Sequence, residues 1–236
     1  MEPKDINFAA MPGTAVNVVT KPAEFFQAMP KTGGFLEPLV FVVIMGLISG
    51  IIQAILNMVG LGYGRGMMGG FGMILFMPIA FAVGSFIGAA ILFVIWKLMG
   101  SQEDYETAYR CCAYLAALSP ITSILGYIPY AGIVINMAIM AYYTVAASIH
   151  VHGIPSQKAW LVFGLLALII ALLGLSAQYR GRQMAARMGG WSGIDRQSAD
   201  DFRKAVREGD ADEMRKQAEK MAREVEQQRR LQEQED

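Results

Sequence analysis

The sequence predicts an all-α fold, namely a polytopic membrane helix bundle of five transmembrane helices with a soluble helical tail at the C-terminus. First, 54% of the 236 residues are hydrophobic and only 17% are charged, less charge than soluble domains usually carry. Second, residues 1–178 hold 7 of the 20 Lys and Arg and 7 of the 20 Asp and Glu, which leaves 13 of each for residues 179–236. Third, five apolar segments approach the roughly 20 residues that a helix needs to cross the hydrocarbon core.

The chain therefore divides into an N-terminal segment of residues 1–34, a transmembrane domain of residues 35–178 and a charged helical tail of residues 179–236. The N-terminal segment lacks a charged region followed by an apolar one, so we expect the first span to serve as its own insertion signal.

One short amphipathic helix is expected before the first span, from Pro22 to Met29. Pro22 suits the first turn of a helix. Phe25, Phe26 and Met29 are available to the lipid surface, so we expect this helix to lie on the membrane.

The predicted spans cover residues of about 38–59, 71–98, 109–125, 130–149 and 160–178. Tyr and Trp gather near their ends, where amphipathic rings prefer the headgroup layer. The third segment is the shortest and contains Pro120 among hydroxyl residues, so we expect it to be kinked or to enter and leave by one face. Five true crossings place the termini on opposite sides of the membrane, whereas a re-entrant third segment leaves both in the cytoplasm.

Two stripes of small residues are predicted to pack helices together. Small side chains that recur every fourth residue let helix backbones approach closely in a membrane. The stripes are Gly46, Gly50 and Ala54 in the first span and Ala80, Gly84 and Gly88 in the second.

A polar stripe, Ser49, Gln53 and Asn57, runs beside the first of these, and Asn136 adds an amide in the fourth span. Hydrogen bonds between helices are the favoured interpretation, because such bonds commonly join transmembrane helices. The alternative is a polar crevice for a lipid headgroup or a small solute.

No catalytic, cofactor or metal site is expected. The pattern Gly64, Gly66 and Gly69 matches a dinucleotide-binding motif in spacing, but it joins two apolar helices instead of a strand and a helix. His150 and His152 lack further ligands nearby in the sequence. The net charge is +0, so the chain has no basic footprint for nucleic acid.

The tail is predicted to be helical. Met214, Ala218, Met221 and Val225 follow coiled-coil spacing and are flanked by charges. Because so short a seam is marginal alone, we expect a helical hairpin, or a docking surface for a partner or a second copy.

From about Lys21 to Gln178 the chain resembles the Yip family of Ypt/Rab-interacting multi-spanning membrane proteins, in its compact prokaryotic branch. The order of loose motifs along the spans carries this resemblance. These motifs are Pro22 with Phe25 and Phe26; Pro38; Pro120; Gly126, Tyr127, Pro129 and Gly132; and His152, Gly153, Lys158 and Ala159.

The resemblance implies a five-helix bundle with a cytoplasmic N-terminus and, in the eukaryotic branch, roles in vesicle traffic through small GTPases and membrane-shaping partners. This chain lacks the acidic Asp-Leu-Tyr-Gly-Pro element of those proteins, so a GTPase partner is doubtful. The tail lies outside the resemblance.

We expect a non-enzymatic scaffold or adaptor of the cell membrane, the inner membrane in a Gram-negative cell. Its expected partners are membrane lipids and other membrane proteins or a second copy of itself. The alternative function is a small-solute or lipid transporter that uses the polar crevice.

Overall fold

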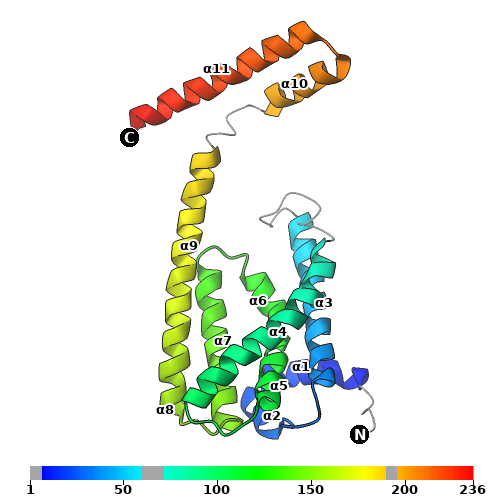
Figure 1. Cartoon of the computed structure of the whole chain (residues 1–236), viewed down its shortest axis with the longest axis vertical. Coiled ribbons are helices and arrows are strands. Elements are labelled where there is room, and N and C mark those ends of the chain that lie inside the picture. The colour runs from blue at the N-terminus through cyan, green and yellow to red at the C-terminus, as the bar shows by residue number, and fades with distance from the viewer. Residues whose placement is uncertain (1–6, 60–71, 190–195, 236) are drawn as a thin grey trace. The chain divides into compact units, whose positions relative to one another are not determined.

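The computed structural model describes residues 7–59, 72–189 and 196–235, and every regular element in these ranges is a helix (Figure 1). The predicted all-α fold is confirmed. The chain forms two compact units, residues 1–174 and 175–236, and the boundary falls inside the last long apolar helix.

Among the described residues, five helical segments are long and apolar enough to cross a membrane, and each overlaps a predicted span. The five segments are Leu36–Met58, Ile74–Leu98, Tyr105–Leu125, Ala131–His150 and Ser156–Gln183. Their elements are α3 (Leu36–Met58), α4 (Gly72–Leu98), α5 (Tyr105–Leu115), η2 (Ala116–Leu118), α6 (Ser119–Leu125), α7 (Ala131–His150), α8 (Ser156–Ala159), η3 (Trp160–Gly164) and α9 (Leu165–Gly189). The predicted set of five apolar spans is confirmed, with the third beginning at Tyr105 instead of residue 109.

The third span is a kinked helix. A 3₁₀ turn separates α5 from α6, and Pro120 occupies the first turn of α6, because proline lacks the N–H that a continuous helix would use. In Figure 1 this run starts at the end of the bundle where α4 finishes and reaches the end where α7 begins. Of the two predicted alternatives, the segment therefore takes the kinked form and traverses the bundle.

Short helices precede the first span. The turn η1 (Phe8–Ala10) leads into α1 (Met11–Thr20), and α2 (Pro22–Ala28) follows after Lys21. The sequence predicted α2 but not α1. In Figure 1, α1 lies across the direction of the spans, at the end of the bundle where α3 begins.

Two side chains of the Pro22–Met29 segment that were expected to face lipid are buried in the protein instead. Phe26 is 1% exposed and Met29 is 5% exposed, and both belong to the protein core. Phe25 meets Tyr114 of α5 edge-on at 5.2 Å between ring centroids, and α2 packs against α7. The bundle itself therefore covers the apolar face that was assigned to lipid.

The core of the first unit draws on nearly all of its helices. Its large members come from six helical elements and include Phe26, Phe41, Trp96, Leu115, Val145 and Phe163. In contrast, the outward faces of α4 and α9 keep side chains such as Leu75, Ile79 and Leu165 exposed. Such faces suit lipid, because the hydrocarbon tails of lipids are as apolar as leucine side chains.

The tail helices α10 (Arg196–Glu208) and α11 (Ala211–Glu235) pack on each other as a hairpin. Gly209, with φ of +70°, ends α10 in the left-handed conformation that glycine adopts without strain. Asp210 then caps α11, because its carboxylate accepts from the backbone N–H of Asp212 and Glu213 at 3.1 and 3.0 Å. Ala205 is buried between the two helices at 2% exposure.

Candidate functional site

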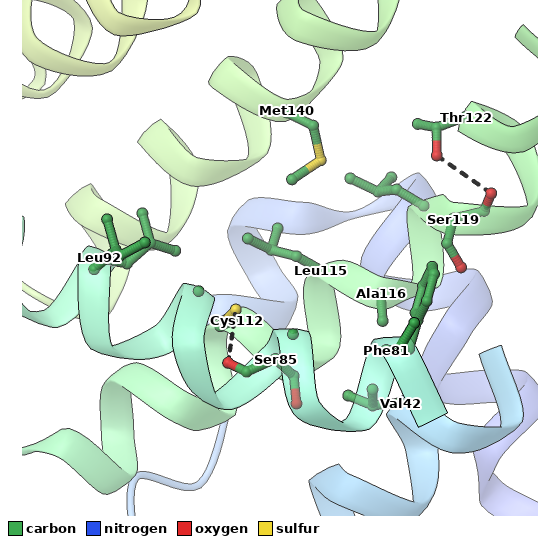
Figure 2. A pocket seen from close by; sticks show the side chains of 15 residues that line it. Val42, Phe81, Ser85, Leu92, Cys112, Leu115, Ala116, Ser119, Thr122 and Met140 are labelled. Atoms are coloured by element: carbon green, nitrogen blue, oxygen red, sulfur yellow. Dashed lines mark hydrogen bonds between the residues drawn. The ribbon is translucent and has the colours of Figure 1, made fainter. Parts of the chain in front are cut away.

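A cavity of about 610 Å³ lies among the spans, between α4 and the kinked third span (Figure 2). Its walls come from α3, α4, α5, η2, α6 and α7. The lining residues are Val42, Ala80, Phe81, Gly84, Ser85, Gly88, Ile91, Leu92, Cys112, Leu115, Ala116, Leu118, Ser119, Thr122 and Met140. The cavity thus lies within the apolar helices, and most of its lining is hydrocarbon.

The four polar side chains on this wall already bond within the protein. Ser85 Oγ donates to a carbonyl three residues earlier at 2.8 Å, and Cys112 Sγ donates to the Ser85 carbonyl at 3.6 Å. Thr122 Oγ1 donates to the Ser119 carbonyl at 3.2 Å, and the Ser119 hydroxyl accepts from Ser49 Oγ at 2.8 Å. Figure 2 shows the Ser85–Cys112 and Ser119–Thr122 bonds. The wall therefore suits apolar groups, such as acyl chains or the side chains of another helix.

The predicted packing residues of α3 lie in a tight helix contact. A Cβ added to Gly46 would lie 3.0 Å from Pro78 Cα and 3.2 Å from the Met77 carbonyl oxygen of α4. Gly50 and Ala54 are buried as well. The small residues of α3 thus allow α4 to approach at the distance of backbone contact.

The predicted packing residues of α4 are placed differently. Ala80, Gly84 and Gly88 all line the cavity. A Cβ added to Gly84 would have no atom within 4 Å, and one added to Gly88 would meet only Cys112 Sγ, at 3.4 Å. In Figure 1, α4 crosses α3 obliquely, and the stripe of α4 faces the cavity and not the glycines of α3.

The residues of the predicted crevice, Ser49, Gln53, Asn57 and Asn136, contribute nothing to the cavity wall. Ser49 is fully buried and bonds to Ser119 of the third span, while Gln53 and Asn57 are half-buried. Asn136 Nδ2 donates to the Thr122 carbonyl at 3.1 Å, and its buried Oδ1 has no partner. Ser49 and Asn136 thus form hydrogen bonds between helices, as the favoured interpretation describes.

The predicted tail seam lies on α11. Met214 and Met221 are half-buried in the hairpin, and Ala218 is exposed. The side chain of Val225 lies outside the described residues, as does the Gly64–Gly69 pattern. Part of the seam is therefore used within the hairpin itself.

Sequence reasoning missed a buried cation. Arg110 of α5, near the start of the third predicted span, is 1% exposed. Its guanidinium donates to the carbonyl of Pro30 at 2.8 Å and to that of Gly34 at 2.9 Å, and it lies 3.4 Å from the Glu37 carboxylate. A buried charge needs such partners. Arg110 therefore connects the segment before α3 to α5. In the sequence, the position of this cation within an apolar run was the feature that could have indicated its burial.

A second polar cluster surrounds His152, in the loop after α7. Trp96 stacks on the imidazole at 3.9 Å between centroids and donates to Ser148 at 2.8 Å. Ser101 Oγ lies 2.8 Å from Nδ1, and Cys111 Sγ lies 3.8 Å from Nε2. Burial lowers the pKa of His152 to about 4, so the ring is neutral at pH 7.

His152 and Cys111 do not make a metal site by themselves, since a structural zinc ion takes four protein ligands. Within the described part of the chain, no group of three or more His, Cys, Asp and Glu side chains is placed to hold a metal ion.

Five apolar helices packed through small residues, with lipid-compatible outer faces, define a multi-pass membrane protein. The family model of the Yip1 domain matches residues 16–178, which is more than half of the chain. The chain belongs to the Yip1 domain family. The match ends at Gln178 and leaves the charged tail outside it. Searches of curated proteins and of solved structures found no match.

Proposed function

We propose that this Yip1 domain protein is a non-enzymatic scaffold or adaptor that organises other membrane proteins in the cell membrane, the inner membrane in a Gram-negative cell. It acts through contacts inside the bilayer and through its C-terminal tail. The partners are other membrane proteins or a second copy of the chain.

The observation that carries this proposal is the uncovered glycine face on α4. Gly84 is exposed on the cavity wall, and a Cβ added at this position would meet no atom within 4 Å. Small residues around an apolar hollow favour the close approach of a helix within a membrane. This face suits an apolar helix from a partner.

The polar chemistry of the bundle also supports binding over catalysis. Arg110 is held by backbone carbonyls, and Ser49 is bonded to Ser119. His152 is neutral and packed against Trp96. These groups hold the bundle together, so none is left free to act on a substrate in the cavity.

The tail supports the adaptor part of the proposal. Val206 of α10 is 51% exposed although the hairpin is formed, and charged residues flank the methionines of α11. Surfaces with a small apolar centre and a charged rim are typical of protein contacts.

The test is partner capture from native membranes after mild crosslinking, with the full chain as bait. Gly84→Leu fills the cavity wall of α4. Val83→Leu is its matched control, because Val83 is the adjacent residue, is 56% exposed and does not line the cavity. A third bait ends after Gly190 and lacks the tail.

We expect Gly84→Leu to reduce the capture of membrane proteins, or of a second copy, several-fold, while Val83→Leu leaves it unchanged. The truncated chain should lose a further, distinct set of partners. If all three baits capture the same proteins as the unaltered chain, the scaffold proposal is wrong.

A further inference from the structure

The helix before the first span is unusually apolar for a segment too short to cross a membrane. From Ile6 to Thr20 the chain has no Asp, Glu, Lys or Arg. The ten residues of α1 extend about 15 Å, and because α1 lies across the direction of the spans (Figure 1), this length runs along the bilayer and not through it. A helix of this kind must have its apolar surface covered by protein or by lipid.

The contacts of α1 place it level with the spans. It packs against α5 and against η2, which begins 11 residues into the third span, about 16 Å along the helix axis. The Tyr143 hydroxyl of α7 donates to the carbonyl of Val19. Tyr143 lies seven residues before the end of α7, or about 10 Å inside it. The helix is therefore positioned at the depth of lipid tails.

Two of the three polar side chains of α1 bond within the helix, while the third, Asn17, is exposed. Thr14 Oγ1 donates to the Ala10 carbonyl at 3.1 Å, and Thr20 Oγ1 donates to the Val16 carbonyl at 2.7 Å. Bonds of this kind within a helix satisfy hydroxyl groups that water does not reach. Lys21 follows directly, with its side chain 61% exposed, and can extend to the headgroups.

One face of α1 is used by the bundle and the other is uncovered. Met11 and Val18 are buried at 6% and 0% exposure, whereas Val16 is 58% exposed and Gly13 has open space around it. We propose that α1 is embedded in a single leaflet, across the direction of the spans, and that its outer face, centred on Val16, contacts the acyl chains of that leaflet. In this position α1 widens the bundle in that leaflet and fixes the N-terminal segment to it. This proposal does not depend on the cavity, because no residue of α1 lines it.

The test uses spin labels in the full chain, reconstituted in vesicles of phosphatidylcholine and phosphatidylglycerol. The native cysteines are replaced through Cys111→Ala and Cys112→Ala. Labels are then placed by Val16→Cys or, as a second site on the same face, by Gly13→Cys. Ile87→Cys is the lipid-facing control, because Ile87 is also 58% exposed, on α4. Gln102→Cys, in the exposed loop after α4, is the aqueous control.

The measurement is the collision rate of each label with oxygen, which concentrates in hydrocarbon, and with a nickel chelate, which stays in water. We expect the oxygen-to-nickel ratio at both α1 sites to be several-fold higher than at Gln102 and close to that at Ile87. A ratio equal to that at Gln102 would place the face in water and overturn the proposal. Low collision rates with both reagents would show that protein covers the face, which also overturns it.

Discussion

Two stripes of small residues with the same spacing have opposite surroundings in this bundle. Gly46 of α3 lies so close to Pro78 that an added Cβ would be 3.0 Å from its Cα, whereas an added Cβ on Gly84 of α4 would meet nothing within 4 Å. The spacing of small residues therefore allows two helices to pack closely, but the angle and position at which the helices cross determine which stripe lies in the contact.

The difference has a local cause in α4. Pro78 lies inside this helix and opposite Gly46. An interior proline has no N–H to donate, so the two helices meet where α3 lacks a side chain and α4 lacks one backbone donor. Beyond this contact, Gly84 lies on the cavity wall. The two glycines can be compared directly by substitution.

If local space determines the tolerance of a glycine, the most sensitive position should be Gly132, which belongs to neither stripe. An added Cβ there would lie 2.1 Å from the Leu125 carbonyl oxygen, in the hairpin between α6 and α7. We expect Gly132→Ala to destabilise the fold by more than about 3 kcal/mol, above the usual range for overpacking. The measurement is the thermal midpoint of the purified protein in detergent, together with the yield of monodisperse protein.

Gly126→Ala is the matched control in the same hairpin, because its Cβ would approach the Thr122 carbonyl only to 3.3 Å. It should fold with a modest loss of stability. Equal midpoints for Gly126→Ala and Gly132→Ala would contradict the geometry of this hairpin.

The next largest effect is expected at Gly46. Gly46→Leu must displace the backbone of α4 at Pro78 and the side chain of Phe81, whose Cβ would lie 3.1 Å from the added Cβ. We expect a loss of about 2–3 kcal/mol, as for overpacked cores. Gly84→Leu adds the same side chain into the cavity and should leave the midpoint nearly unchanged. The comparison fails if the two leucine variants unfold at the same temperature.

A pH series can show whether the stability contributed by the cluster around His152 is independent of the difference between the two glycine positions. The pKa of His152 falls from 6.5 to about 4 on folding because of burial, with Lys31 and Lys97 lowering it further and Glu103 opposing them. Below pH 6.5 the unfolded chain binds the proton more readily. Stability is therefore full above about pH 6.5 and is lost progressively toward pH 4, by about 3 kcal/mol, because each pKa unit corresponds to about 1.4 kcal/mol.

Melting curves at pH 7.5 and pH 5 check this expectation, and His152→Gln should flatten the pH dependence. The contacts of His152 and of Gly46 share no residue. The difference between Gly46→Leu and Gly84→Leu should then be the same at both pH values, since effects at independent sites add. A difference that changes with pH would show that the two regions are coupled.

The spans were predictable because they depend on continuous apolar length, which the sequence displays directly. The burial of Phe26 was not, because an amphipathic face can be covered by lipid or by protein with the same residue pattern. The kink at Pro120 was expected, but whether the segment crossed depended on contacts with α3 and α7 that sequence spacing does not contain.

The candidate site was less predictable than the fold. The residues Ala80, Gly84 and Gly88 were predicted to pack helices together, yet they line a cavity wall, and this depends on the course of α4. Arg110 was visible as a lone cation in an apolar run, but its partners, the carbonyls of Pro30 and Gly34, are backbone atoms more than 70 residues away. A pattern of side chains in the sequence cannot indicate which backbone carbonyls will accept hydrogen bonds from a buried arginine.

The smallest expected effect is that of alanine at the two glycines. It is also the sharpest test of the comparison between Gly46 and Gly84, because the change in thermal midpoint should have opposite signs at the two positions. Glycine in a helix interior is less favourable than alanine by up to about 1 kcal/mol. Gly84→Ala gains this difference without a clash, so the midpoint should stay or rise slightly. Gly46→Ala gains the same intrinsic difference but places a methyl group 3.0 Å from the α4 backbone, so its midpoint should fall. If Gly84→Ala is destabilising as well, another surface already occupies the α4 face in the purified protein.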